Sequence, residues 1–319
     1  MQGAPAMSKE TVIDFARRHR TASDYFYLLV DGQAECALDH PLSVPSLTRS
    51  FGEAAVTRVP RPDMSHEQDH CPALIQLATP GEGVSKDYLD LSADYSAWDL
   101  NYDERYICGW LTSREPLEVV AAHIAARCYT TADEAGDPSP WFEPLRLELL
   151  LCAMQKQAGC LLRPIQNWLL PLSWGAYTVA RSSEYACDPE LSERARQTQQ
   201  LASEVNAFLG IWRHALTLPE GFAPWRWKGP GILPEQASVH GLRLIRDARQ
   251  LGLHNSSDRI SLSLHRVFMH PLLPQHPDIQ QAISQARAGS LDLPSHFATY
   301  SEATWKRIVY SLPLAKDYS

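Results

Sequence analysis

The chain has 319 residues, of which 45% are hydrophobic and 21% are charged, and a chain of this length can bury a sizeable core and divide into two lobes. Its 37 Asp and Glu residues outnumber its 29 Lys and Arg residues, which gives a formal charge of −8. This balance argues against non-specific nucleic-acid binding, because a phosphate backbone requires a basic protein face.

Cysteine usage and targeting signals indicate where the protein resides. The seven cysteines are odd in number and scattered, and several lie in apolar runs: Cys108, Cys128, Cys152 and Cys160. This pattern predicts buried free thiols in a reducing cytosol. Residues 1–10 lack the apolar core of a signal peptide, and no apolar stretch approaches the ~20 residues that span a bilayer. We therefore expect a soluble, cytoplasmic protein that does not contact a membrane.

The first hundred residues predict strands separated by polar segments. The clearest strand is 25–32, an apolar and aromatic run that ends in the turn signal Asp31-Gly32. The run 72–78 is a second candidate strand. The other expected elements are a leader with an N-terminal helix (1–24), a helical or irregular segment up to 51, a loop over 58–71, and a loop with a short helix over 86–103.

The stretch 106–168 is the centre of the predicted fold. It begins with a buried strand, 106–113, whose Ser113 can cap a helix with a strong apolar stripe. Further on, Glu143 and Pro144 suit the first turn of a mostly apolar helix. The remaining expected elements are a second strand (127–131), a loop (133–140), that apolar helix (145–158), a Leu/Pro connector (161–172) and a last strand (173–181). Alternation of strands and helices is typical of an α/β layer.

After residue 188 the pattern becomes helical. Asp188 and Pro189 suit a helix start, and a long helix over 191–212 follows. Further helices are expected over 236–253, 277–288 and 301–312, whereas 257–270 fits either helix or strand. The sequence thus predicts an α/β or α+β protein of two lobes, with a mixed sheet flanked by helices and an all-helical C-terminal lobe. The expected domains are 1–24 (leader and helix), 25–187 (sheet lobe) and 188–319 (helical lobe).

The sequence has no nucleophile elbow, no Walker loop and no dinucleotide-binding glycine motif, so no motif favours an enzyme, although catalytic residues can also be assembled by folding. The nearest approach to a metal cluster is His66, His70 and Cys71, which lie in a segment that reads as loop. A solvated polar loop is the favoured interpretation, and we predict no metal site. Asp87 and Asp90 are typical of a solvated face, and His123 of a packing histidine.

The loop 218–234 is the most distinctive feature for partner binding. It places Phe222, Trp225, Arg226 and Trp227 close together among prolines. Tryptophan and arginine carry much of the energy of protein interfaces, which makes these four residues candidates for binding a partner protein. The alternative is that both indoles seal the seam between the lobes, as the usual burial of large aromatics favours.

Five segments of the chain match the motifs of one known family. The likeness covers residues 25–181, and the helical lobe only in general layout. The matching segments are Tyr27-Leu28-Leu29-Val30-Asp31-Gly32, Pro72-Ala73-Leu74-Ile75-Gln76-Leu77, Gly109-Trp110-Leu111-Thr112-Ser113, Trp141-Phe142-Glu143-Pro144-Leu145-Arg146 and Arg163-Pro164-Ile165-Gln166-Asn167-Trp168. Three departures are Glu143, where the family has Asp, the missing arginine before Trp141, and the following arginine, which is displaced to Arg146.

Together these segments resemble a family of bacterial type VI secretion adaptors, the domain of unknown function 4123. The resemblance implies an adaptor or chaperone that makes and breaks no bonds, has no catalytic residues and needs no cofactor. It would bind a toxic effector in the producing cell, help to load it onto the spike protein VgrG, and exist as a monomer or a one-to-one heterocomplex. Two other functions stay open. One is a small metal-assisted hydrolase that uses His66, His70 and Cys71, and the other is a scaffold subunit of a larger assembly.

Overall fold

The computed structural model describes residues 11–61, 64, 66–101, 104–131, 138–184, 191–217 and 232–313. The chain divides into two compact units, Met1–Ala202 and Ser203–Ser319, called here the sheet unit and the helical unit. Among the described helices, none is long and apolar enough to cross a membrane.

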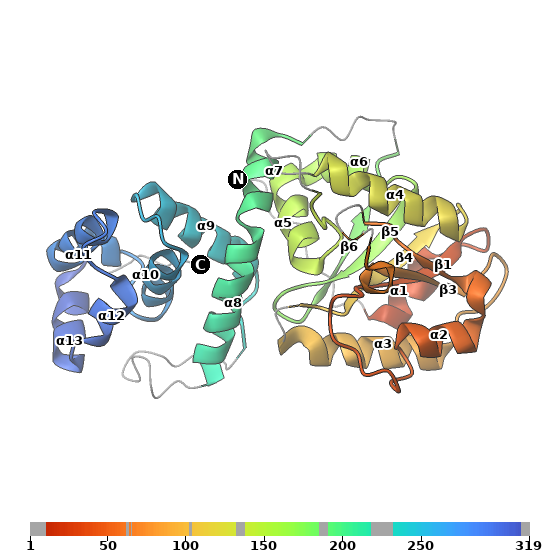
Figure 1. Ribbon diagram of the computed structural model, residues 1–319, viewed down its shortest axis with the longest axis horizontal. Coiled ribbons are helices and arrows are strands. Elements are labelled where there is room, and N and C mark those ends of the chain that lie inside the picture. Colours follow the sequence, from red (N-terminus) through yellow and green to blue (C-terminus); the bar gives the residue numbers. More distant parts are fainter. Residues whose placement is uncertain are drawn as a thin grey trace. The chain divides into compact units, whose positions relative to one another are not determined.

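The sheet unit is built on one antiparallel sheet (Figure 1), which has six strands in the described part of the chain, in the order β2-β3-β1-β4-β5-β6. The strands are β1 (Tyr25–Val30), β2 (Val56–Arg58), β3 (Ala73–Ala78), β4 (Ile107–Ser113), β5 (Ile165–Pro171) and β6 (Tyr177–Arg181). Each neighbouring pair is antiparallel. The predicted fold class is confirmed, but the sheet differs from the expected mixed sheet, because all neighbouring pairs among the described strands are antiparallel, with β1 between β3 and β4.

Helices cover both faces of the sheet. One face carries α1 (Val12–His19), α2 (Val44–Phe51) and α3 (Lys86–Trp98), and the other carries α4 (Leu117–Thr130), α5 (Pro144–Met154) and α6 (Gly159–Leu162) (Figure 1). Side chains alternate along β1 as a strand requires. Phe26, Leu28 and Val30 therefore enter one core, while Tyr27 and Leu29 enter the other.

Three tryptophans anchor the two cores, and each is fully buried with its indole N–H paired. Trp110 donates to Ser92 Oγ at 2.9 Å, Trp141 to the Ile124 carbonyl at 3.0 Å, and Trp168 to the Cys108 carbonyl at 3.2 Å. Burial of an aromatic ring stabilises the fold most when its polar atom finds a partner. These indoles tie β4 to α3, α4 to the start of α5, and β5 to β4.

Two predicted elements in the centre of the chain are wrong. Residues 127–131, predicted as a strand, form the end of α4, because Cys128 packs into the core one helical turn beyond Ile124. The predicted connector 161–172 contains strand β5, which pairs with β4 and β6. Its prolines misled the prediction. Pro164 precedes the strand and Pro171 ends it, positions where a missing N–H breaks no central ladder.

The boundary between the units lies later than the predicted position near Asp188. Helix α7 (Glu193–Gln200) belongs to the sheet unit, since Ala195 enters its core. Arg146 and Gln199 also exchange side chain–carbonyl hydrogen bonds of 3.1 and 3.0 Å between α5 and α7. The predicted long helix over 191–212 is therefore two helices, which separate at Leu201.

The helical unit contains α8 (Ala202–Thr217), α9 (Ala237–Gln250), α10 (Ser256–Phe268), α11 (Pro277–Arg287), α12 (Leu293–Ala298) and α13 (Glu302–Ser311). The segment 257–270, left open between helix and strand, is helix α10. Its buried Asp258 accepts the Leu293 N–H at 2.8 Å and thereby fixes the start of α12. Arg259 binds Glu204 at 2.6 Å and joins α10 to α8.

Cysteine pairing differs from the expectation. Five cysteines are free thiols: Cys36, Cys71, Cys108, Cys128 and Cys152. Cys160, at the start of α6, is disulfide-bonded, so its prediction as a free thiol is wrong. Disulfide formation depends on which segments the fold brings together, and an odd number of scattered cysteines does not reveal this.

Candidate functional site

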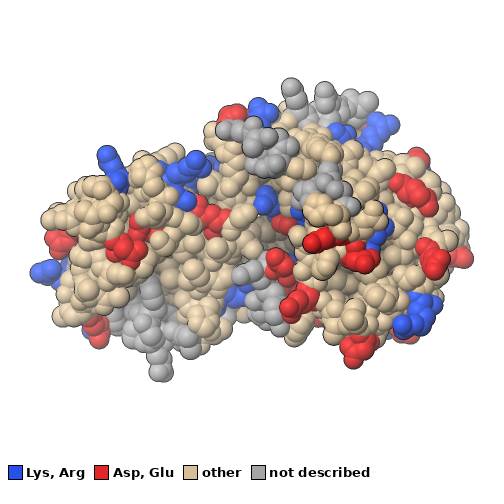
Figure 2. All heavy atoms as spheres, viewed as in Figure 1, with Lys and Arg blue, Asp and Glu red and all other residues tan. Residues whose placement is uncertain are grey.

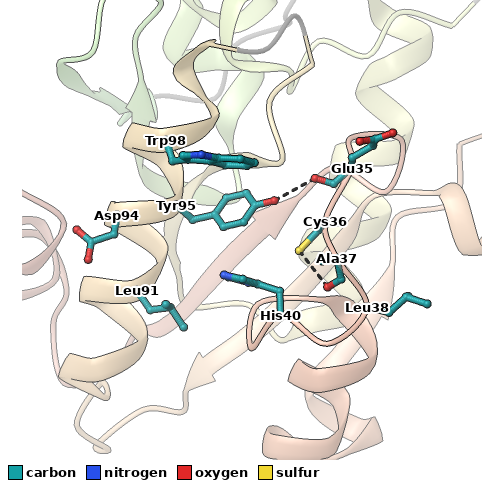
Figure 3. A pocket seen from close by; sticks show the side chains of 9 residues that line it. All are labelled: Glu35, Cys36, Ala37, Leu38, His40, Leu91, Asp94, Tyr95 and Trp98. Carbon is teal, nitrogen blue, oxygen red and sulfur yellow. Dashed lines mark hydrogen bonds between the residues drawn. The ribbon is translucent and has the colours of Figure 1, made fainter.

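An open pocket of about 700 Å³ lies on the sheet unit between α3 and the segment that follows β1 (Figure 3). We call it the α3 groove. It is lined by Glu35, Cys36, Ala37, Leu38, His40, Leu91, Asp94, Tyr95 and Trp98. The side chains from α3 recur at helical spacing, so one helix face forms one wall of the groove and the segment 35–40 forms the other.

Tyrosine hydroxyls hold the segment 35–40 in place. Tyr95 of α3 donates to the Glu35 carbonyl at 3.0 Å, and Tyr106, just before β4, donates to the Leu42 carbonyl at 2.8 Å. Ser43 donates to the Leu38 carbonyl at 2.9 Å and caps α2. The exposed wall of the groove is thus tied to the sheet and to both flanking helices, which lowers the ordering cost of binding a partner.

Helix α3 is also held in place by hydrogen bonds to the residues of the sheet unit that lie beneath it. Its Ser92 accepts the Trp110 indole N–H, and its C-terminal end is held by Arg105, which contacts Asp99 at 2.7 Å and the Ser96 carbonyl at 2.9 Å. The Arg105–Asp99 pair is almost fully buried. Both walls of the groove are therefore held by hydrogen bonds to residues of the sheet core.

The groove presents apolar side chains to solvent. Trp98 is 54% exposed and Leu38 is 78% exposed, although the large apolar side chains of this chain are mostly buried. Tyr95 lies between Trp98 and His40, with its ring packed edge-on against His40 at 4.8 Å and against Trp98 at 5.2 Å (Figure 3). Exposed aromatic surface beside a pocket is typical of a protein-binding site.

Acidic side chains surround this apolar surface. Glu35 and Asp94 line the groove itself, and Asp87 and Asp90 are exposed on the same helix. Asp87 and Asp90 therefore form a solvated face, as predicted. The only cation of α3 is Lys86 at its first position, and the sequence from 31 to 48 has no Lys or Arg.

The groove holds no activated nucleophile among its described lining residues. Burial raises the pKa of the Cys36 thiol, so the thiol stays protonated at neutral pH, whereas a reactive cysteine has a lowered pKa. His40 accepts the Leu42 N–H through Nδ1 at 3.1 Å and packs against Tyr95. The arrangement offers apolar contact and negative charge.

The sequence-predicted sites have different outcomes. Phe222, Trp225, Arg226 and Trp227 lie outside the described residues, so their role in binding stays a prediction. His66 and His70 are exposed, whereas Cys71 is buried and its thiol donates to the Met64 carbonyl at 3.9 Å. Within the described parts of the chain, no three His, Cys, Asp or Glu side chains are placed to hold a metal ion.

His123 is placed as a packing histidine. Its Nε2 lies 2.8 Å from the Leu161 carbonyl, and its ring approaches Trp141 edge-on at 6.4 Å. Burial lowers the pKa of His123 to about 4. The imidazole is therefore neutral over the physiological range and joins α4 to α6.

Two acidic residues from separate family-like segments come together in the sheet unit. Burial and, to a smaller extent, the Asp31 carboxylate raise the pKa of Glu143 to about 7 against the opposing effect of Arg146, which lies 3.0 Å away. Burial also raises the pKa of Asp31, against the effect of the Gln33 N–H at 3.1 Å and of Arg61. The turn after β1 and the start of α5 are therefore close enough for the Asp31 and Glu143 carboxyl groups to interact. The sequence did not predict this proximity.

The α3 groove was not predicted from the sequence. Its signal was present in Leu91, Tyr95 and Trp98, which recur at helical spacing beside the acids of the same helix. Comparisons with protein-family models, with curated proteins and with solved structures found no match to this chain.

Proposed function

We propose that this chain is a non-enzymatic adaptor or chaperone that binds a type VI secretion effector and helps to load it onto the VgrG spike. The observation that supports protein binding is the α3 groove, where Trp98 and Leu38 are exposed on walls held by buried hydrogen bonds. The choice of an effector as partner depends on the resemblance of the segments 27–32, 72–77, 109–113, 141–146 and 163–168.

The physical task of such a protein is to hold a partner and then release it. Release requires moderate apolar area with a polar rim, because a large dry interface dissociates slowly. The α3 groove has this character: a short aromatic surface bordered by carboxylates. Binding of this kind needs no cofactor, and a one-to-one complex uses one groove for each partner.

Co-expression tests the proposed function. We expect the chain to co-purify in a one-to-one complex with the effector encoded beside its own gene, in cells that lack the other secretion proteins. A stable homo-oligomer that ignores this effector would instead indicate a scaffold subunit. Stoichiometric zinc or another transition metal in the purified protein would support the metal-assisted hydrolase.

The predicted aromatic loop is tested in the same assay. We expect a variant with Phe222→Ala, Trp225→Ala and Trp227→Ala to lose most of the co-purifying effector, because large aromatics dominate interface energies. Circular dichroism and thermal unfolding establish that the variant is folded. Full recovery of effector by a folded variant would remove these residues from the binding surface.

A cytoplasmic location makes a separate prediction for Cys160. Disulfides are rare in the reducing cytoplasm, so we expect this cysteine to be reduced in the cell and to pair only after purification in air. Alkylation of thiols at the moment of lysis, followed by peptide mass spectrometry, measures its state, with the free Cys152 as the labelled control. An unlabelled Cys160 in freshly lysed cells would argue for an oxidising compartment.

A further inference from the structure

The two units of the chain differ in charge. Residues 1–202 contain 28 of the 37 Asp and Glu residues and 17 of the 29 Lys and Arg residues, a formal charge of −11. Residues 203–319 contain the other 9 acidic and 12 basic residues, a formal charge of +3. The negative charge of the protein is therefore a property of the sheet unit, and Figure 2 shows acidic side chains along its edge near α3.

Within the sheet unit, α3 combines acidic and apolar stripes. Asp87, Asp90 and Asp94 follow one another at intervals of three and four residues, which places them on one side of the helix. Leu91, Tyr95 and Trp98 follow one another at intervals of four and three residues and line the groove. Each stripe is about two helical turns long, or about 10 Å, and the two lie side by side over about one turn, from Leu91 to Asp94.

We propose that the α3 groove binds an amphipathic helix whose polar face is basic, supplied by the partner protein. An apolar stripe two turns long matches the anchor spacing of a helix bound in a groove, with leucine-like side chains at i, i+3 or i+4, and i+7. The carboxylates of Asp90, Asp94 and Glu35 face lysine and arginine side chains on the flanks of that helix. This inference depends on the proposed function only in naming the effector as the source of the helix.

A second apolar surface provides the matched control. Val119 and Tyr129 are 44% and 54% exposed on α4, which covers the opposite face of the sheet, and Glu115 and Glu118 are exposed acids close by. None of these four side chains lines the α3 groove. A difference in peptide binding between variants of the two surfaces therefore reports on the groove itself and not on non-specific attraction to exposed apolar and acidic side chains.

The test uses two fluorescent helical peptides, one with leucine on one face and lysine on the other, and one in which glutamate replaces each lysine. Fluorescence anisotropy with the full chain measures binding. We expect the lysine peptide to bind, the glutamate peptide to bind at least about tenfold more weakly, and added salt to weaken the first complex. Equal binding of the two peptides, or none, would overturn the proposal.

Two pairs of variants locate the binding site. Asp90→Lys with Asp94→Lys is expected to weaken lysine-peptide binding about tenfold or more, whereas Glu115→Lys with Glu118→Lys, which changes the net charge equally, leaves it within about twofold. Trp98→Ala with Leu38→Ala is expected to weaken binding about tenfold, and Val119→Ala with Tyr129→Ala is the neutral control. Equal losses in test and control pairs would mean non-specific attraction and would contradict the proposal.

Two further outcomes separate this inference from the proposed function. If the Asp90→Lys/Asp94→Lys variant still co-purifies with the effector, the groove is not the effector site, although the adaptor function stands. If the wild-type chain binds the lysine peptide but no neighbouring effector, the adaptor function fails while the groove chemistry stands. Concentration-dependent dimers that Trp98→Ala abolishes in sedimentation would assign the groove to a second copy of this chain and overturn the proposal.

Discussion

Substitution of Gly109 by alanine is expected to destabilise the sheet unit by about 3–5 kcal/mol, a large fraction of the stability of a typical domain. Gly109 lies in β4, between β1 and β5, with φ of 144°, a conformation that L side chains rarely adopt. A Cβ atom there would lie 2.6 Å from the Leu169 carbonyl oxygen and closer still to the Trp168 indole nitrogen. Neither neighbour can move freely, because Trp168 is fully buried and Leu169 pairs with β4.

Chemical denaturation of the Gly109→Ala variant measures this effect, and Gly83→Ala is its control. A Cβ at Gly83 meets open space, so that variant is expected to unfold within about 0.5 kcal/mol of the wild type or to be slightly more stable. A Gly109→Ala variant that is as stable as Gly83→Ala would show that the Trp168 indole does not pack against Gly109. The same result would place the indole hydrogen bond to the Cys108 carbonyl in doubt.

The core strands were predictable because burial on both faces leaves a continuous apolar run. β1, β3 and β4 are such runs, and each lies in the middle of the sheet, where both faces are covered. β5 was not predicted as a strand, because Asn167 and the two prolines at its ends interrupt the apolar run. Asn167 is nonetheless satisfied in place, since its amide donates to the His19 carbonyl at 3.1 Å and to Thr112 Oγ1 at 3.0 Å. Such partners are visible only after folding.

The candidate site was harder to predict than the core. Its two walls, 35–40 and α3, are separated by β2 and β3 in the sequence and meet only because β1 pairs with both β3 and β4. The apolar and acidic stripes of α3 could have been recognised if the whole of 86–98 had been predicted as helix. Alternation of acids with aromatics instead suggested a loop with a short helix, because the average polarity of the segment hides its two faces.

Acid is expected to destabilise the helical unit through His265 of α10. This imidazole stacks on Trp305 at 4.9 Å, packs against Phe297 at 4.7 Å, and its Nδ1 lies 2.8 Å from the Ser261 carbonyl. Burial lowers the pKa of His265 to about 4, from an ordinary value of 6.5. Between about pH 6.5 and pH 4, His265 is protonated in the unfolded chain but stays neutral in the folded chain. The free energy of unfolding therefore falls as the pH drops through this range.

Linkage gives the size of the effect and its control. Between about pH 7 and pH 5, the lowered pKa of His265 contributes a loss of about 2 kcal/mol. Denaturant unfolding at both pH values should show this loss in the wild type and in His254→Gln, whose histidine is exposed, and a loss smaller by about 2 kcal/mol in His265→Phe. Because His123 and the raised pKa of Glu143 act in the sheet unit of all three proteins, their contributions cancel in the difference. An unchanged pH dependence in His265→Phe would mean that His265 is accessible to protons in the folded state, and that its packing between Trp305 and Phe297 opens before the unit unfolds.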